Sequence, residues 1–390
     1  GVPRAAAAVP APGGDSATPQ ASPLRVSAFN CETLAEVEPH ALGLTYEFEA
    51  APEGDPYAVT IGFEGRRAGA TREPGPGDRF AVSTTVDRVL PGSGRVAVTT
   101  RIPNLAPGPW QVVARPAVQR LGDTGAAAAS GDARAVPPPL PGGFAEGATG
   151  WAPVINVRAP GVLLGAWPAL VGLGAVVALI IQVLLAARFG LPVPRVVLVS
   201  LVACLVGLIG AKLYYLALYP AARRRALYGG GMCIQGFVLG AAAALMMGAW
   251  MAGIGIGSLL DITAPGLMFG MTIGRFGCFF GGCCVGRPTA SRWGLWSSDR
   301  RLGARRIPTQ LLEAALAAAI GVTTLVVLII AGLPEPAGVV FVGTVAAYVV
   351  GRQLLLPLRV EPAKTRHGRA LVLAAAATVL AADLVVVIAA

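Results

Sequence analysis

Two patterns of hydrophobic and polar positions divide the chain. Between residues 24 and 120, apolar and polar residues alternate in short runs, and Pro- and Gly-rich turns such as PEGDP and LPGSG separate these runs. Alternation with a period of two is typical of strands with one buried face, and short strands at regular spacing indicate an antiparallel sandwich. The six runs that we expect to form strands are LRVSAF, LGLTYEFEA, YAVTIGFE, RFAVSTTV, GRVAVTT and WQVVARPAV.

From residue 151 onward, long apolar segments replace the alternation. Seven of them are long enough to cross a bilayer as helices. The third and fourth are interrupted by glycines, and Asp261 lies between them. The seven expected spans cover residues 161–187, 196–219, 230–251, 262–282, 308–330, 337–358 and 370–389.

The two patterns predict four regions. Residues 1–23 are rich in Ala, Pro and Gly and read as a disordered lead-in. Residues 24–120 form a small all-β sandwich, in which the entry to the strand at Trp110 resembles that of immunoglobulin-like and fibronectin-III-like modules. Residues 121–150 read as an Ala/Pro/Gly linker, and residues 151–390 as an all-α polytopic membrane domain.

Composition and charge support a membrane protein and exclude an ordinary soluble one. The mean hydropathy is +0.65, and only 13% of the residues are charged. Residues 1–150 hold twelve Arg and fifteen Asp or Glu, whereas residues 151–390 hold nineteen Lys or Arg and six Asp or Glu. A basic membrane domain favours anionic phospholipid headgroups as partners, and no nucleic-acid-binding motif is present.

The cysteines and histidines indicate neither a disulfide scaffold nor a metal centre. Five of the six cysteines lie in or beside apolar segments, where a thiol behaves mostly as a small hydrophobe, and Cys31 has no partner in its own domain. The chain has two histidines, His40 and His367, which disfavours a histidine-based metal site. We therefore predict no metal and no cofactor.

The stretch GRFGCFFGGCCVGRPT, residues 274–289, carries the strongest candidate chemistry. Arg275 lies inside an apolar segment, where a charge is costly unless it faces the interior of the helix bundle or a wet cavity. A guanidinium group suits phosphate, and glycines allow close approach of a ligand or a backbone. The stretch is either a phosphate-holding site or a glycine-packed helix in which Arg275 snorkels to the surface.

Four motifs in this order resemble the prolipoprotein diacylglyceryl transferase family over about residues 160–390. They are GLIGAKLYYLALY at 207–219, GGGMCIQGFVLG at 229–240, the block at 274–289 followed by IPTQLLE, and Tyr348-x3-Arg352-x6-Arg359. The resemblance implies a seven-span fold and transfer of a diacylglyceryl group from phosphatidylglycerol to a lipobox cysteine thiol. Arg275 matches the family's phosphatidylglycerol-binding arginine, Arg352 its sixth-span arginine, and Tyr348 the tyrosine one turn before it.

The chain departs from the family at the positions that handle protons. Gln235 stands where the family has an essential histidine, and an amide cannot act as a base. Cys278 replaces an Asn, Cys283 replaces a Glu, and Leu356 replaces a sixth-span Glu. A thiolate at Cys283 is the rival base or covalent carrier, against a plain buried thiol. We assign catalysis to Arg352, Gln235 and Cys283, and substrate binding to Arg275, Arg287, Tyr348, Cys278, Gly286 and Glu313.

Three functions stay open at this point. The first is the family's transfer onto a prolipoprotein signal-peptide region, the second is transfer to an altered acceptor, and the third is a catalytically impaired relative that binds phospholipid or lipoprotein and recruits partners through its β-sandwich. The positive-inside rule would place the basic loops and the β-domain in the cytoplasm. The family orientation places them outside the cytoplasm instead, in the bacterial plasma membrane, and we expect that orientation.

Overall fold

The computed structural model describes residues 22–27, 37–69, 75, 77–120, 137–220, 231–361 and 367–389. The chain forms two compact units. The β unit comprises residues up to Asn156, except two segments, Glu49–Asp55 and Leu90–Thr99, which belong with Val157–Ala390 in the membrane unit. Residues 1–21 of the expected lead-in, residues 121–136 of the expected linker and Cys31 lie outside the described residues.

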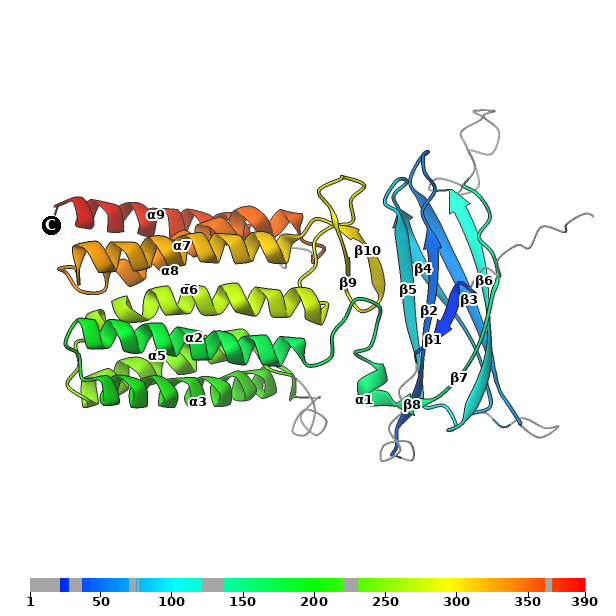
Figure 1. Ribbon diagram of the computed structural model, residues 1–390, viewed down its shortest axis with the longest axis horizontal. Helices are drawn as coiled ribbons and strands as arrows, with labels where there is room; N and C mark the ends of the chain where they lie inside the picture. Colours follow the sequence, from blue (N-terminus) through cyan, green and yellow to red (C-terminus); the bar gives the residue numbers. More distant parts are fainter. Residues whose placement is uncertain are drawn as a thin grey trace, which may run out of the picture. The chain divides into compact units, whose positions relative to one another are not determined.

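Two antiparallel sheets make up the β unit (Figure 1). One sheet has the order β4-β3-β6-β7, and the other contains β1, β2 and β5, with β8 paired to β2. The predicted all-β fold is therefore confirmed, and all six expected strands are present. The strands are β1 (Leu24–Val26), β2 (His40–Glu49), β3 (Tyr57–Arg67), β4 (Arg79–Val89), β5 (Arg95–Pro103), β6 (Pro109–Arg120), β7 (Gly143–Ala148) and β8 (Gly150–Trp151).

The alternating pattern forms the core of this unit. Along β3, the side chains of Val59, Ile61 and Phe63 are fully buried, whereas the residues between them are more exposed. Trp110 on the neighbouring β6 is also fully buried, and its Nε1 donates to the carbonyl oxygen of Ala106 at 3.2 Å. Because a buried indole N–H must find an acceptor, this bond explains how the largest core side chain is accommodated.

The structure places strand β7 inside the segment that the sequence predicted as a linker. The segment Gly143–Ala148 is built from glycines and small residues and lacks the apolar alternation that marks the other strands. It pairs along the edge of β6, with Val112 opposite Ala145. Nearby, the hydroxyl of Tyr46 donates to the carbonyl oxygen of Pro141 at 2.5 Å, and burial raises the pKa of Tyr46 to about 12. Long-range pairing, not local propensity, makes this strand.

The described part of the membrane unit holds seven helices long and apolar enough to cross a membrane, as the sequence predicted (Figure 1). A short helix, α1 (Ala152–Ile155), precedes them at the end of the β unit. The seven are α2 (Ala166–Arg188), α3 (Val193–Leu218), α5 (Ile234–Met251), α6 (Ile256–Gly281), α7 (Thr309–Ala331), α8 (Val339–Leu355, continued by the 3-10 turn Leu356–Leu358) and α9 (Gly368–Ala389).

Glycines set the closest helix pairs of this unit. Helix α2 packs along α6, and α3 packs along α5. A Cβ atom on Gly174 would lie 2.7 Å from the carbonyl oxygen of Gly270, and one on Gly210 would lie 2.5 Å from that of Gly236. Small residues let membrane helices approach until their backbones touch, and such packing replaces the hydrophobic drive that lipid does not provide.

Asp261 corrects one expectation about the spans. The sequence placed it between the third and fourth spans, but it lies inside α6, which begins six residues earlier than predicted. Its carboxylate is fully buried and accepts hydrogen bonds from the backbone N–H groups of Gly338 at 2.6 Å and Phe341 at 2.9 Å. These groups belong to the start of α8. A neighbouring helix thus provides the anionic cap that α8 lacks in its own sequence.

A second buried polar group links three helices. The side-chain amide of Gln182 on α2 donates to the hydroxyl of Thr263 on α6 at 2.7 Å, and it accepts from the hydroxyl of Ser200 on α3 at 2.8 Å. Both hydrogen-bonding functions of the amide are therefore used. Interhelical bonds of this kind fix the helices against one another where no water can substitute.

The arginine-rich segment between α6 and α7 contains a hairpin that the sequence did not predict. Its strands are β9 (Leu295–Ser298) and β10 (Leu302–Arg306). Within the membrane unit, β10 also pairs with the start of β5, so that Leu302 lies opposite Val98. The indole of Trp296 donates to the carbonyl oxygen of Arg95 at 3.0 Å. The hairpin orders the residues that lead from α6 to α7.

Candidate functional site

Arg275 lies near the C-terminal end of α6, and its guanidinium group is buried among three helices. Its Nε forms an ion pair with Oε2 of Glu313 on α7 at 2.8 Å, and its Nη2 donates to the hydroxyl of Tyr348 on α8 at 3.3 Å. Arg275 is only 8% exposed, so it does not snorkel to the surface. The structure therefore brings together three residues that the sequence assigned to substrate binding.

A second arginine shares the same carboxylate. Glu313 is 1% exposed, and its Oε1 lies 3.9 Å from Nη1 of Arg359, which is itself 4% exposed. Nη2 of Arg359 also contacts Glu361, whose side chain is 65% exposed to solvent. We call Arg275, Arg359, Glu313 and Tyr348 the arginine cluster. Its buried groups comprise two cations and one anion, and such a positive surplus favours binding of an additional anion.

The segment that carries Arg359 is held by the loop that follows α6. Gly286 forms an isolated β-bridge with Arg359, and the exposed Arg287 donates from Nε to the Arg359 carbonyl oxygen at 3.3 Å. A Cβ atom on Gly286 would collide with the carbonyl oxygen of Ile307. Gly286 and Arg287, both assigned to substrate binding from the sequence, thus contact the backbone that positions the arginine cluster.

Arg306, at the end of β10, is a buried arginine that supports this loop. It is 1% exposed and donates to the carbonyl oxygens of Gly286 at 3.2 Å and Leu302 at 3.0 Å, and to Oδ2 of Asp299 at 2.9 Å. Burial lowers the pKa of its guanidinium group, while the charge of Asp299 acts in the opposite direction. Because its partners are mostly backbone carbonyls, Arg306 acts as a brace for the loop.

Arg352 lies one helical turn beyond Tyr348 on α8, so the two side chains project from the same face of that helix. Its side chain is half-buried, near the C-terminal end of the helix. Tyr348 packs against Met268 and Ala317, which places this face of α8 toward α6 and α7. That Arg352 and Arg275 share one site stays a prediction.

Gln235 occupies the first turn of α5, and its side chain is exposed. Its amide oxygen accepts from the thiol of Cys233 at 3.0 Å. Helix α5 packs mainly on α3, and no hydrogen bond among the described residues joins Gln235 to the arginine cluster. The two histidines, His40 and His367, are respectively buried at the start of β2 and exposed just before α9.

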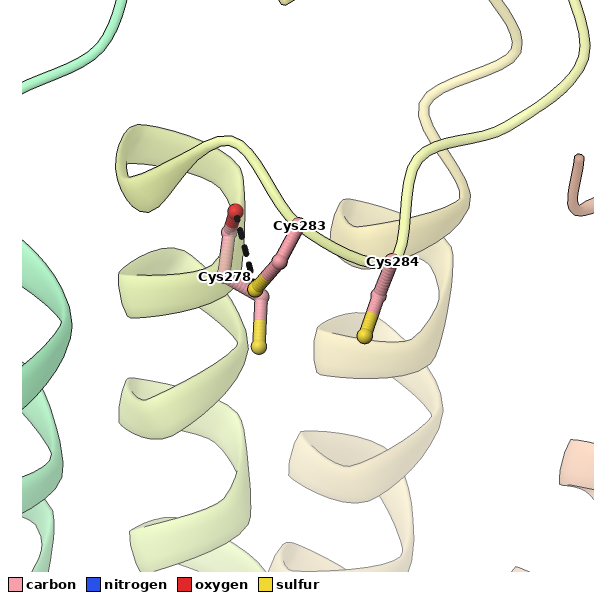
Figure 2. Close-up of side chains that lie close together, drawn as sticks. All are labelled: Cys278, Cys283 and Cys284. Atoms are coloured by element: carbon pink, nitrogen blue, oxygen red, sulfur yellow. Dashed lines mark hydrogen bonds between the residues drawn. The ribbon is translucent and has the colours of Figure 1, made fainter. Parts of the chain in front are cut away.

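Three thiols gather at the C-terminal end of α6 (Figure 2). The sulfur atoms of Cys278, Cys283 and Cys284 all lie within 4.8 Å of one another. Hydrogen bonds from Cys278 and Cys283, together with the charges of Arg359 and Arg275, hold the pKa of the Cys284 thiol far below its usual value. The same contacts with Cys278 and Cys284 raise the pKa of Cys283. Of the two loop thiols, Cys284 is therefore the more acidic, whereas the sequence suggested a thiolate at Cys283.

Two members of this site escaped the sequence assignment. Arg359 stood in the motif Tyr348-x3-Arg352-x6-Arg359, but nothing local shows that it returns to contact Glu313. Arg306 stood in a run of arginines that charge alone marks as exposed. For Arg359, the spacing of the motif could have identified it as a site residue. For Arg306, the sequence holds no such signal, because its burial depends on the hairpin of β9 and β10.

Comparisons with known proteins give a consistent result for the membrane unit. The family model described as prolipoprotein diacylglyceryl transferase matches residues 157–389. Relatives named phosphatidylglycerol–prolipoprotein diacylglyceryl transferase include one from Dehalococcoides mccartyi, 34% identical over 25% of this chain and 38% of its own length. The one numbered 2 from Streptomyces coelicolor is 34% identical over 44% of this chain and 58% of its own length. One from Geobacter sulfurreducens is 34% identical over 38% of this chain and 58% of its own length.

The chain therefore spans between about two fifths and three fifths of the length of these relatives. The family match begins at residue 157, so the described strands of the β unit lie outside it.

Proposed function

Because the chain belongs to the prolipoprotein diacylglyceryl transferase family, we propose that it transfers a diacylglyceryl group from phosphatidylglycerol to a thiol acceptor in the membrane. The acceptor that the family suggests is the cysteine of a prolipoprotein signal-peptide region, and an altered acceptor is the variant of this proposal. Relatives whose names state this activity support it.

The observation that carries the proposal is the buried positive surplus of the arginine cluster. Two guanidinium groups, Arg275 and Arg359, share the single carboxylate of Glu313 inside a membrane-spanning unit. Glu313 is the one buried carboxylate among the described residues that pairs with either arginine, and a phosphate group would add negative charge beside the two guanidinium groups that share it. Arginine is also the side chain that binds phosphate oxygens in a bidentate manner. A phospholipid headgroup fits both requirements.

The proposed reaction is a substitution at a glyceryl carbon of the lipid. The acceptor sulfur forms a bond with this carbon, the carbon–oxygen bond to phosphate breaks, and glycerol phosphate leaves with the bonding electron pair. The thiol proton passes to a base or to water. The arginine cluster acts on the leaving phosphate, where negative charge develops as the bond breaks. This positioning of charge requires no proton transfer by Arg275 or Arg359.

Removal of the proton from the acceptor thiol is expected to limit the rate, and a substitution at Gln235 tests this. A thiol is mostly protonated near neutral pH, and the amide of Gln235 cannot accept its proton. We expect the Gln235→His variant to transfer faster than the wild type, by up to about 10²–10⁴-fold. Purified full-length protein in phosphatidylglycerol liposomes, with a lipobox peptide as acceptor, provides the rate by mass spectrometry of the peptide.

The exposed Gln111 of β6, which bonds Glu146, is the matched control. Gln111→His adds the same imidazole at a distant strand and should leave the rate unchanged. A wild type as fast as authentic family members, together with no gain at Gln235→His, would refute the assigned role of this position. Complementation of a strain depleted of its own diacylglyceryl transferase tests the proposal as a whole, and failure with every acceptor would refute it.

The exposed position of Gln235 favours a second candidate function. In this alternative the chain binds phospholipid or lipoprotein at the arginine cluster without transferring a group, and the β unit recruits a partner. Retention of phosphatidylglycerol by the purified wild type, with no transfer even by Gln235→His, would select this alternative. Loss of both lipid retention and transfer would exclude both candidates.

We also propose that the β unit lies outside the cytoplasm, in a bacterial plasma membrane protein. The family orientation supports this, although the basic loops would favour the reverse by charge alone. In a Cys31→Ser background, we expect Ser83→Cys on the exposed side of β4 to react with an impermeant maleimide in intact cells. Arg195→Cys, in the first turn of α3 at the opposite end of the span formed by α2, should react only after lysis. The inverse labelling pattern would reverse the orientation.

A further inference from the structure

The three thiols of Cys278, Cys283 and Cys284 are gathered more tightly than their role as small hydrophobes requires. Cys278 belongs to the last turn of α6, and the other two follow the end of that helix (Figure 2). Their sulfur atoms lie within 4.8 Å of one another, and all three residues are at least partly buried. Among the described residues they form a compact group of ligand atoms of one chemical kind.

Two left-handed backbone conformations, just after the end of α6, bring the three thiols together. Gly282, which ends α6, has φ 66°, and Cys284 has φ 56°. A side-chain-bearing residue in the left-handed region is uncommon and unfavourable, so the surrounding structure must hold it there. The effect is to bring the two loop thiols back to the helix. Cys284 is thus held in a strained conformation that serves the position of its sulfur.

Contacts from α7 keep the loop in place. The amide Nε2 of Gln310 donates to the carbonyl oxygen of Cys283 at 3.0 Å, and the Thr309 hydroxyl donates to that of Cys284 at 3.4 Å. The backbone N–H of Cys283 donates to the carbonyl oxygen of Cys278 at 3.1 Å. These bonds hold the backbone of the loop, and the thiol of Cys283 itself donates to the carbonyl oxygen of Cys278 at 3.8 Å (Figure 2). The three sulfur atoms stay within 4.8 Å of one another. A ligand that bound all three sulfurs would meet a preformed site.

Three thiolates are soft ligands that select thiophilic ions such as Cu(I) and Zn(II). With metal–sulfur bonds of about 2.3 Å, three sulfurs around one ion lie roughly 3.8–4.0 Å apart. Small side-chain rotations would contract the observed group to this spacing. The negative charge of three thiolates in an apolar region requires compensation. The ion supplies part of it, and the nearby guanidinium groups of Arg275 and Arg359, which act on Cys284, supply more.

We propose that Cys278, Cys283 and Cys284 bind one thiophilic d10 metal ion, Cu(I) or Zn(II). Binding displaces the thiol protons into solution and changes no oxidation state, so no other reactant is needed. The inference concerns the sulfur atoms and requires no transferase activity, but Arg275 and Arg359 take part both in the charge compensation of the thiolates and in the proposed phosphate site. An occupied site would withdraw Cys283 from the role of covalent carrier.

The test uses the full chain, purified in detergent, reduced and stripped with a chelator. One sample is dialysed against Zn(II) and another against Cu(I) under anaerobic conditions, and bound metal is measured by elemental analysis. We expect one ion per chain in at least one of the two samples. The sample that retains metal against a competing chromogenic chelator identifies the preferred ion.

Serine variants show whether the three sulfurs are the ligands. Each of Cys278→Ser, Cys283→Ser and Cys284→Ser should weaken binding by more than the roughly 10–100-fold typical of residues that only orient a ligand. Cys204→Ser on α3 is the matched control, because Cys204 is an exposed free thiol of the same unit, and it should bind as the wild type does. Metal retained equally by all four variants would overturn the proposal.

A measurement on the wild type alone covers the case in which a variant fails to fold. Added metal should protect Cys278, Cys283 and Cys284 from alkylation, as mapped by mass spectrometry, and leave Cys204 reactive. It should also raise the thermal midpoint of unfolding, because a ligand that binds only the folded state stabilises it. If the reduced wild type retains no metal and added metal does not protect the three cysteines, the proposal is overturned. This holds also if oxidation then produces a disulfide between two of these cysteines.

Discussion

Replacing Arg275 by alanine is expected to lower diacylglyceryl transfer by at least about 10²-fold, the loss typical of removing one preorganised group that stabilises developing charge. The physical reason is the position of its guanidinium group, which is buried beside Glu313 and Tyr348 and contributes to the positive surplus. The rate is measured with phosphatidylglycerol liposomes and the best acceptor found. Retention of phosphatidylglycerol through purification should fall as well.

A control must separate phosphate binding from structural pairing, because an ion pair with Glu313 is also what a purely structural arginine would make. The double variant Arg275→Gln/Glu313→Gln replaces the pair by two neutral amides that can bond each other. We expect it to recover much of the stability but not the transfer. Recovery of transfer by the double variant would show that the pair is structural. Arg188→Ala should leave the rate unchanged, because it removes an exposed guanidinium group at the C-terminal end of α2, whereas the start of α2 lies beside the Arg275 end of α6.

Replacing Glu313 by alanine is expected to destabilise the membrane unit by about 3–5 kcal/mol, because it leaves the buried guanidinium group of Arg275 without its carboxylate partner. Its carboxylate is the partner of both Arg275 and Arg359. Thermal or chemical unfolding in detergent, followed by circular dichroism, provides the measurement. Added anionic lipid should restore part of the loss in this variant, since a phosphate group would replace the missing charge.

The chain offers an unusually close control for this prediction. Glu361 also forms an ion pair with Arg359, at 2.7 Å, but its side chain is 65% exposed. Exposed pairs contribute at most about 1 kcal/mol, so Glu361→Ala should scarcely change the stability. Equal effects of the two substitutions would mean that Glu313 is not the counter-charge of the buried arginines.

Local patterns in the sequence are sufficient to predict the secondary structure of this protein but not its contacts. A period of two and an apolar length of about twenty residues are properties of consecutive residues, so the strands of the β unit and the seven membrane helices follow from them. Strand β7 was missed because its glycines and small residues carry no periodic signal, and the edge of β6 pairs with it nevertheless. Asp261 was misplaced because a charge suggests the end of a span, whereas its partners lie on another helix.

The candidate site shows the same division. The motifs placed Arg275, Glu313 and Tyr348 among the site residues, and the structure joins them across three helices. The sequence could not reveal that Arg359 shares Glu313, because that contact depends on how the end of α8 returns to α7. The crowding of the three thiols likewise requires two left-handed residues, which no sequence pattern marks at Cys284. The sequence thus identified several side chains of the site, but it could not show which of them contact one another in the folded chain.

The amide of Gln182 has a consequence for how the chain is inserted into the membrane during synthesis. It enters with α2, but its acceptor Thr263 follows 81 residues later on α6, after Ser200 has arrived on α3. Until then one end of the amide has no partner in the lipid interior, which is unfavourable for a polar group. Helix α2 therefore gains by remaining beside the insertion machinery until α6 emerges. The hydrogen bonds of Gln182 are therefore complete only once α6 has been inserted beside α2 and α3.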